Sequence, residues 1–390
     1  MIKLNKHIWE TVNLESLFLI ERGGSPRPID DYFTDEEDGI NWIKIGDTTD
    51  ITKYVYHTKQ KIKPAGIKNS RMVYDGDFIL SNSMSFGRPY IMKTTGCIHD
   101  GWLLLREKRD NIDKEYLYTV LSSDLLFRQF KSFAAGTTVK NLNIEVVKKV
   151  EIPLPPLEEQ KQIASLFQSI ETAMEQVDGQ EKNLKALQKS LVNGLLSKEP
   201  EFGNLLNSRN CTPTTFGEIA ECDKKYPEHE KEVKRFVGLE FIEADNFQLQ
   251  GWGEIANGTT FSKRFVKGDV LFGKRRAYLK KVAIADFDGI CSGDILVIRA
   301  KAKKILQGLL PYYISADAFI QHAVSTSAGS LSPRTKWKDL AELDVSIPDI
   351  KTQETILEVL QQLDTTVDQL KQQKTTLKNL KQKLLNEILG

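Results

Sequence analysis

The amino-acid sequence contains few cysteines and no long hydrophobic run. Its four cysteines, Cys97, Cys211, Cys222 and Cys291, form no C-x-x-C pair. The sequence therefore predicts neither a disulfide scaffold nor a zinc site, and reduced thiols are expected. No apolar stretch approaches the roughly 20 residues that cross a bilayer, and no apolar signal-peptide segment follows the first residues. We therefore expect a soluble protein of the cytoplasm.

Catalytic and metal-binding patterns are also missing. The five histidines show no i,i+4 or Cys-linked spacing of the kind that binds a metal. Residues 268–275 resemble a phosphate-binding loop, but Arg275 stands where the magnesium-binding Ser or Thr belongs. A strand that runs into a surface loop is the better interpretation of this stretch. We expect no catalytic residue, no metal and no cofactor in this chain.

Neither sign of charge dominates the chain as a whole. The net charge is +1, from 54 basic and 53 acidic residues, which argues against a uniformly basic coat for nucleic acid. The charge is nevertheless uneven, because residues 263–304 carry twelve Lys and Arg against four Asp. A milder basic stretch occupies residues 53–71 in the first half. Such patches are found on DNA-binding proteins and also on ordinary solvated faces, so both interpretations stay open.

What the sequence does contain is an internal repeat of globular module and long helix. A repeat of this length indicates duplicated domains, since the units of a solenoid span only about 20 to 50 residues. The matches occur at an offset of 193 residues, or of 192 for the Gly-Asp pair. The aligned pairs include Pro155 with Pro348, Gln160 with Gln353, Gly136 with Gly329, and Gly76-Asp77 with Gly268-Asp269.

Apolar residues recur every seven residues in the second part of each copy. This spacing is typical of a coiled-coil seam, with an ordinary core-facing helix as the alternative. Two helices of about 40 residues, each about 60 Å long, can satisfy their seams by antiparallel pairing about a pseudo-two-fold axis. The apolar positions, here called the first row, are Ile163, Ile170, Val177, Leu184 and Leu191, and Ile356, Leu363, Leu370, Leu377 and Leu384.

Gln180 and Gln373 occupy the position three residues after the first row, near the middle of each helix. In an antiparallel pair they would approach the axis. We expect them either to hydrogen-bond to each other and fix the register, as buried polar pairs do in coiled coils, or to face solvent.

The globular modules have the pattern of mixed α/β structure. Short apolar runs bounded by Gly and Asp predict buried strands, and helical periodicity extends over residues 116–130 and 305–323. The expected fold class is α+β, with two mixed α/β modules joined by two long helices that form an antiparallel coiled coil. The expected segments are module 1 at 1–155, helix 1 at 156–198, a linker at 199–211, module 2 at 212–348 and helix 2 at 349–390. The expected strands include residues 78–80, 102–105, 270–272 and 295–298.

Several short motifs occur in a characteristic order along this duplicated frame. They are residues 21–26 (ERGGSP), 41–47 (NWIKIGD), 76–77 (GD), 136–138 (GTT) and 152–160 (IPLPPLEEQ). With these motifs the whole chain resembles the specificity subunit (HsdS) of type I restriction-modification systems. The second module has no run like ERGGSP, so the entry residues of the first module are not carried over to it.

The resemblance implies a non-catalytic DNA-recognition subunit. Each module would be a target recognition domain that reads one half of a bipartite, asymmetric DNA site. The helices would space the readers and dock two adenine methyltransferase subunits, with restriction/translocase subunits as further partners and no membrane involved. S-adenosylmethionine, ATP and Mg would bind to those partners. The alternative is a coiled-coil adaptor without DNA specificity, which explains the heptads but not the paired basic loops.

Candidate DNA contacts lie on the loops after the Gly-Asp strands and near the later glycine of each module. Arg can bind guanine and Asn adenine through two hydrogen bonds, whereas Lys and Ser more often hold phosphate. For about half of such a set, an ordinary surface role is the alternative. The candidates are Asn82, Ser83, Ser85, Arg88, Tyr90, Thr137, Thr138 and Lys140 in module 1, and Lys274, Arg275, Arg276, Tyr278, Ser330, Ser332, Arg334 and Lys336 in module 2.

Overall fold

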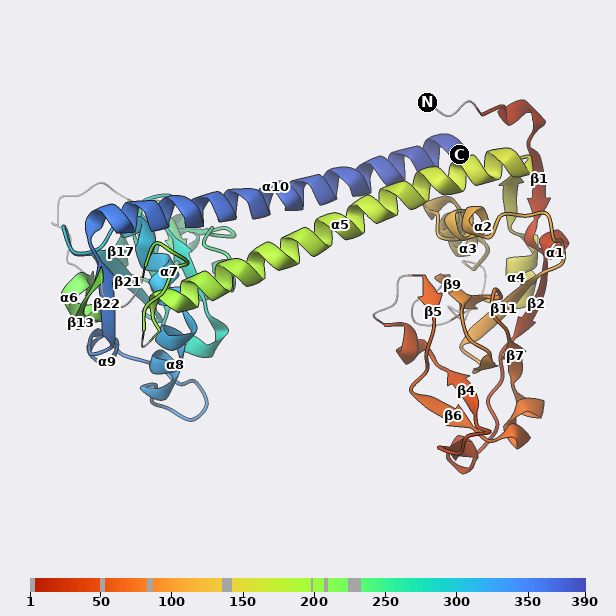
Figure 1. The fold of residues 1–390 in the computed structure, drawn as a ribbon, viewed down its shortest axis with the longest axis horizontal. Helices are drawn as coiled ribbons and strands as arrows, with labels where there is room; N and C mark the ends of the chain where they lie inside the picture. Colours follow the sequence, from red (N-terminus) through yellow and green to blue (C-terminus); the bar gives the residue numbers. More distant parts are fainter. Residues whose placement is uncertain are drawn as a thin grey trace. The chain divides into compact units, whose positions relative to one another are not determined.

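The computed structural model describes residues 4–49, 53–82, 87–134, 142–197, 199–206, 210–223 and 233–390. The expected fold class is confirmed, since two mixed α/β modules are joined by two long helices (Figure 1). By packing, the chain divides into unit 1, Met1–Gln176 with Lys374–Gly390, and unit 2, Val177–Gln373. Each unit therefore contains one module and part of each helix, whereas the sequence suggested a simple succession of modules and helices.

Unit 1 is built on two five-stranded sheets. Their strand orders are β2-β11-β8-β9-β5 and β3-β6-β4-β10-β7. The pairs β4 with β10 and β5 with β9 are parallel, and the other pairs are antiparallel. The strands are β2 Phe18–Arg22, β3 Phe33–Thr34, β4 Ile40–Ile43, β5 Tyr54–Val55, β6 Gln60–Ile62, β7 Arg71–Val73, β8 Phe78–Ser81, β9 Pro89–Met92, β10 Gly96–Ile98 and β11 Trp102–Glu107, with a separate ribbon of β1 Glu10–Asn13 and β12 Glu151–Leu154.

Short polar residues begin three helices of unit 1. Asn13, Asp113 and Asn143 each accept a hydrogen bond from a backbone N–H of the first turn, which satisfies a group that the helix itself cannot pair. The periodicity over 116–130 corresponds to two helices instead of one, because Ser123 caps a second start through Leu126 N. The helices are α1 Leu14–Leu17, α2 Lys114–Leu121, α3 Asp124–Ala134 and α4 Ile144–Lys149.

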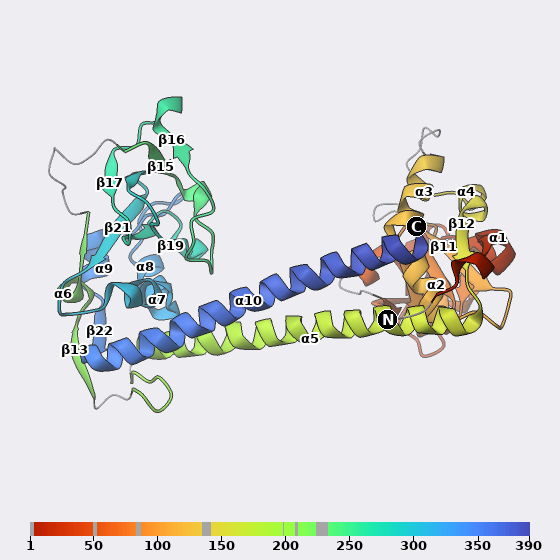
Figure 2. The same ribbon diagram turned by 90° about the horizontal axis from the view of Figure 1, so that it is seen from above.

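Unit 2 repeats this plan with two four-stranded sheets. Their orders are β14-β21-β18-β19 and β16-β15-β20-β17. Figure 2 shows the second of these sheets lying apart from α10, whereas α7 lies beside that helix. The elements are β13 Cys211–Thr215, α6 Phe216–Ile219, β14 Ala220–Cys222, β15 Arg235–Val237, β16 Gly253–Glu254, β17 Lys263–Phe265, β18 Val270–Gly273, β19 Val282–Ile284, β20 Gly289–Cys291, β21 Ile295–Ala300, α7 Leu310–Ser315, α8 Asp317–Ser325, α9 Trp337–Ala341 and β22 Asp344–Pro348, which pairs with β13.

The two long helices, α5 (Leu157–Leu195) and α10 (Ile350–Leu389), are antiparallel within each unit. In unit 1 the beginning of α5 meets the end of α10, and Lys381 Nζ lies 2.7 Å from Glu171 Oε1. In unit 2 the end of α5 meets the beginning of α10, and Gln188 Nε2 donates to Asp364 Oδ1 at 2.6 Å. The predicted antiparallel pairing is therefore confirmed.

The second row of the seam differs from the expectation. First-row residues are buried or half-buried, but the next buried row lies four residues after them, not three. Its apolar members are Phe167, Met174, Leu195, Leu360, Val367 and Ile388. Both spacings lie on one face of a helix, and the larger apolar side chains at the fourth position decide which row is covered. The first row is thus the d position of the heptad.

The prediction of a buried, hydrogen-bonded glutamine pair is therefore wrong. Gln180 and Gln373 belong to the row that the structure leaves outside the seam, and both side chains are exposed. Of the two alternatives for these glutamines, the solvent-facing one holds. Leu187 and Leu380, in the same row, are 48% and 43% exposed.

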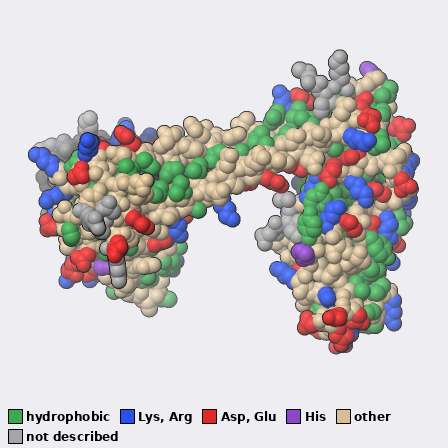
Figure 3. All heavy atoms as spheres, viewed as in Figure 1, with side chains coloured by type: hydrophobic (Ala, Val, Ile, Leu, Met, Phe, Trp, Pro, Cys, Tyr) green, Lys and Arg blue, Asp and Glu red, His purple; other side chains and the backbone are tan. Residues whose placement is uncertain are grey.

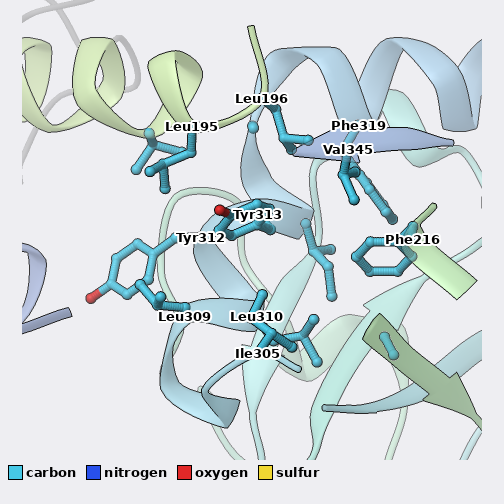
Figure 4. Close-up of a cluster of buried hydrophobic side chains, with 14 of the residues drawn as sticks. Leu195, Leu196, Phe216, Ile305, Leu309, Leu310, Tyr312, Tyr313, Phe319 and Val345 are labelled. Atoms are coloured by element: carbon cyan, nitrogen blue, oxygen red, sulfur yellow. The ribbon is translucent and has the colours of Figure 1, made fainter. Parts of the chain in front are cut away.

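The end of α5 is embedded in the core of unit 2. Leu195 and Leu196 reach toward Tyr312 and Tyr313 of α7, as Figure 4 shows. The segment expected as a linker continues this packing, since Phe202 is only 3% exposed. Module 2, the end of α5 and the segment that follows α5 therefore share one core.

Candidate nucleic-acid interface

Two loops of unit 2 that are distant in sequence are joined into one surface. Residues 274–280 follow β18, and residues 328–336 precede α9; together they are called the basic loop pair below. Arg275 and Arg334 form an antiparallel backbone bridge. Arg276 N donates to Pro333 O at 2.8 Å, and Thr335 N donates to Lys274 O at 3.2 Å. All eight residues proposed for module 2 belong to this surface.

The basic loop pair carries a surplus of positive charge, and Asp294 pairs with two of its arginines. Asp294 accepts from Arg334 Nε at 2.7 Å and lies 3.6 Å from Arg275 Nη1. The hydrogen bond from Arg334 holds the pKa of Asp294 below its usual range, so this carboxylate is ionised at neutral pH. It offsets one of the six cations of the basic loop pair. Those cations are Lys274, Arg275, Arg276, Lys280, Arg334 and Lys336.

The accessible side chains of the basic loop pair are of the types that contact DNA. Arg276, Arg334 and Lys336 are exposed, and Tyr278 is 53% exposed. Arg forms bidentate hydrogen bonds with guanine, and Lys and backbone amides hold phosphate. This surface can therefore both grip a duplex backbone and reach a base edge.

The far end of the first loop is tied to the long helix α5. Lys280 Nζ lies 2.5 Å from Asp317 Oδ1 at the start of α8. Asp317 also accepts from Asn193 Nδ2 of α5 at 2.9 Å, and its backbone N–H donates to Asn193 Oδ1 at 2.8 Å. The hydrogen bond from Lys280 lowers the pKa of Asp317. The loop is therefore anchored at both ends, at Asp294 and at the helix.

A turn with the same geometry begins the central strand of each module. Gly268 adopts a φ of 91°, where a side chain is strained, and its counterpart Gly76 has a φ of 88°. The next residue, Asp269 or Asp77, accepts from a backbone N–H three residues before it at 2.8 Å. The Gly-Asp pair that marks the repeat thus forms a turn that sets the direction of the following strand and of the loop after it.

Each of these buried aspartates is paired with an arginine of the neighbouring strand. In unit 2, Arg299 Nη2 lies 2.5 Å from Asp269 Oδ2, and in unit 1, Arg106 Nη2 lies 2.6 Å from Asp77 Oδ2. Burial of an ion pair stabilises only with good geometry and further hydrogen bonds, and both are present here.

A second shared device lies at the junction of module and helix. Gln160 Oε1 accepts from Asp113 N, and Gln353 Oε1 accepts from Leu306 N, both at 2.9 Å. Their amide groups donate to Pro155 O and Pro348 O. Both glutamines are buried, so the match found in the sequence reflects a helix start that is fastened to its own module.

The structure corrects two of the DNA contacts proposed for module 1. Asn82 is 1% exposed, and its amide donates to Asp100 O at 2.9 Å, so it supports a loop and does not face a ligand. Tyr90 is also 1% exposed and packs edge-on against Trp102. Arg88 is exposed, with its guanidinium 5.3 Å from the Tyr90 ring centre. The proposed residues Ser83, Ser85, Thr137, Thr138 and Lys140 lie outside the described residues.

One end of unit 1 is unsuited to DNA. Asp35, Glu36, Glu37 and Asp38 are all exposed, and Figure 3 shows acidic side chains gathered at the lower end of this unit. Like charge repels phosphate. Any DNA-facing surface of unit 1 therefore lies away from the loop between β3 and β4.

Sequence reasoning missed three residues of the unit 2 surface. Asp294 and Asp317 organise its cations, and Leu331, at its tip, is 88% exposed. The two aspartates carry no sequence signal, because their role depends on partners about 20 to 40 positions away. Leu331 does carry one, since it is the apolar residue in the polar run 329–334 (GSLSPR).

The described part of the chain shows no cluster of metal ligands. Across these residues, no three His, Cys, Asp or Glu side chains are grouped so that they could hold a metal ion. The same residues include no helix that is long and apolar enough to cross a membrane. All four cysteines are free in the structure.

Comparison with known proteins identifies relatives along most of the chain. Residues 7–186 and 211–379 match the family described as the type I restriction modification DNA specificity domain. The type I restriction enzyme EcoDI specificity subunit of Escherichia coli is 25% identical over 292 residues, which are 65% of this chain and 63%, just under two thirds, of that protein. The type I restriction enzyme MjaVIII specificity subunit of Methanocaldococcus jannaschii is 22% identical over 348 residues, 82% of this chain and 79% of that protein.

A solved structure shares the fold. The crystal structure of the HsdS subunit from Thermoanaerobacter tengcongensis superposes with a TM-score of 0.53 at 18% sequence identity, covering 99% of this chain and 97% of the other. The two matched stretches fall one in each half, each with a module and most of its long helix. The chain therefore belongs to the type I restriction-modification DNA specificity family, with one copy of the family's domain in each half.

Proposed function

We propose that this chain is the non-catalytic DNA-recognition subunit of a type I restriction-modification complex, and that it reads a bipartite, asymmetric site. The observation that carries the proposal is the basic loop pair, in which two arginine-bearing loops are locked together around Asp294. A coiled-coil adaptor without DNA specificity would not require this surface. The family membership and the specificity subunits among the relatives support the same conclusion.

The two modules carry a different side chain at one matching position of a repeated backbone frame, which supports two different half-sites. Lys274 of unit 2 stands where unit 1 has Asn82, and each accepts a backbone N–H from the later loop at 3.2 and 3.1 Å. The backbone frame is therefore repeated, whereas the side chain at this position is half-buried in one unit and buried in the other. An asymmetric pair of readers fits an asymmetric DNA site.

The long helices are proposed to space the readers and to dock two methyltransferase subunits. A helix of 39 residues is about 58 Å long, which is longer than the core of a module requires. Its middle is only partly covered, since Asp178, Gln180 and Lys182 are exposed. S-adenosylmethionine, ATP and Mg would bind on the partner subunits, and the chemistry of methylation and cleavage belongs to them.

Exchange of one module tests the bipartite reading. Replacing residues 1–155 with the first module of another family member should change one half of the methylated site and leave the other half and the spacing intact. The readout is methylation sequencing of a host that carries the complete system. The matched control exchanges residues 212–348, which should change the other half instead. A change of both half-sites by either exchange would contradict independent reading.

Neutralising Asp294 should expose its arginines to phosphate. In Asp294→Asn, with the complex assembled, binding to random duplex should strengthen, and the slope of log affinity against log salt should steepen by about 0.9, the value for one added phosphate contact. Because the pKa of Asp294 is lowered, its ionic contribution is present at neutral pH and is lost only as the pH falls through that lowered value. Asp286→Asn, an exposed aspartate outside the basic loop pair, is the control. An unchanged slope in Asp294→Asn would argue against phosphate contact by these arginines.

A further inference from the structure

Leu331 has no role in the reading of DNA by charge and hydrogen bonds. It lies at the tip of the basic loop pair and is 88% exposed, whereas the next most exposed large apolar side chain of the described residues, Ile8, is 54% exposed. Its neighbours Ser330 and Ser332 are small. No described residue of unit 2 therefore shields this side chain from water.

The backbone around Leu331 is held in place by the two arginines beneath it. Arg276 Nη2 donates to Leu331 O at 3.3 Å, and Arg275 Nη2 donates to Ser332 Oγ at 3.2 Å. The turn begins at Gly329, whose φ of 108° is open to glycine, and Pro333 stiffens its other side. A side chain on a loop fixed in this way loses little further freedom when it binds.

Duplex DNA offers few apolar surfaces that could bury an exposed apolar side chain surrounded by cations. Proteins that deform a duplex insert Leu, Phe or Pro between stacked bases while neighbouring Arg and Lys hold the phosphates on either side. The basic loop pair presents both parts of that arrangement, with Leu331 at the tip and Arg275, Arg276 and Arg334 around its base.

We propose that Leu331 inserts between two stacked base pairs in the half-site read by module 2 and kinks the duplex there. This inference rests on the proposed function. It also assigns a specificity role to Leu331, because pyrimidine–purine steps unstack more easily than others and would be preferred at the insertion point. Module 2 would then recognise part of its half-site through the ease with which that DNA sequence deforms.

Base unstacking tests the insertion directly. The assembled complex with its methyltransferase subunits is bound to a duplex that contains its methylated site, with 2-aminopurine placed at one position of the second half-site at a time. We expect a several-fold rise in fluorescence at one step, lost in Leu331→Ala and retained in Leu331→Phe. Leu205→Ala is the control, because this leucine is 39% exposed and lies outside the basic loop pair.

Affinity measurements separate this inference from the proposed function. An abasic site at the responsive step removes the cost of unstacking and should tighten binding of the wild type by about tenfold, which lies within the free energy that unstacking one base step costs, with little effect on Leu331→Ala. If the complex fails to bind its site at all, the proposed function is wrong. If it binds and Leu331→Ala changes neither fluorescence nor affinity, insertion is wrong. A third result would also contradict insertion: replacing thymine by uracil weakens binding as much as Leu331→Ala does, and binding of the wild type changes no 2-aminopurine fluorescence. Leu331 would then contact a thymine methyl group.

Discussion

Replacing Arg275 and Arg276 together with alanine is expected to weaken binding to the second half-site by about 100-fold and to leave reading of the first half-site intact. Each bidentate contact from arginine to guanine contributes about 1–3 kcal/mol of discrimination, so two of them account for a loss of this size. The variant also loses the hydrogen bonds from these side chains to Leu331 O and Ser332 Oγ, whereas the backbone hydrogen bond from Arg276 N to Pro333 O remains and helps the loop to keep its place. The measurement is binding to duplexes in which one half-site at a time is scrambled.

The lysine variant separates charge from recognition. Lysine keeps the positive charge but lacks the planar fork that matches guanine. Arg275→Lys with Arg276→Lys should therefore retain affinity for random duplex and its salt dependence, and still lose discrimination within the second half-site. Full discrimination in the lysine variant would show that these arginines hold only phosphate. Loss of discrimination at both half-sites would contradict the assignment of this surface to one module.

Removing Arg299 is expected to cost unit 2 about 3 kcal/mol of stability, because it leaves the buried carboxylate of Asp269 without its bidentate partner. Asp269 is only 2% exposed, and unit 1 has a core of its own, so the loss should be confined to unit 2. Hydrogen exchange measures this separately for each unit. In Arg299→Ala, amides of β18 and β21 should exchange faster, whereas those of β8 and β11 should not.

The pH dependence gives this prediction a second readout. Burial already raises the pKa of Asp269 to about 7 in the wild type, and loss of the Arg299 guanidinium should raise it further. A carboxyl whose pKa is raised in the folded state destabilises that state at high pH, and the penalty disappears as the pH falls and the group becomes protonated. The difference in the stability of unit 2 between Arg299→Ala and the wild type should therefore become smaller as the pH falls. Arg106→Ala is the matched control, since it should loosen unit 1 and not unit 2. Equal loosening of both units by either variant would contradict the division into separate cores.

The frame of the molecule could be predicted from its sequence because it depends on local rules. Seven-residue spacing of apolar side chains is local to a helix, and a Gly-Asp turn before a strand is local to a few residues. The junction glutamines Gln160 and Gln353 were visible as a match at a fixed offset, although their role as fasteners required the positions of Asp113 N and Leu306 N. These features led to the fold class and to the family.

The details that were missed depend on neighbours that are distant in sequence. Asn82 follows a central strand just as Lys274 does, but a short amide can turn inward to Asp100 O, and nothing in the local sequence reveals that choice. The heptad pattern alone allows a second row either three or four positions after the first row, and the larger side chains four positions after it decide the burial. Leu331 carries neither a charge nor a side-chain hydrogen-bonding group, which are the features that mark candidate DNA contacts in a sequence.

Unit 1 is discontinuous along the chain, and this affects the order in which the protein can fold during synthesis. Residues 177–373 form unit 2 without interruption, so its core can close as soon as they have left the ribosome. The core of unit 1 includes Leu385, Ile388 and Leu389, which follow all of unit 2 in the chain. Until they emerge, Ile163 and Phe167 of α5 lack part of their cover. The module synthesised first is therefore the last to be completed.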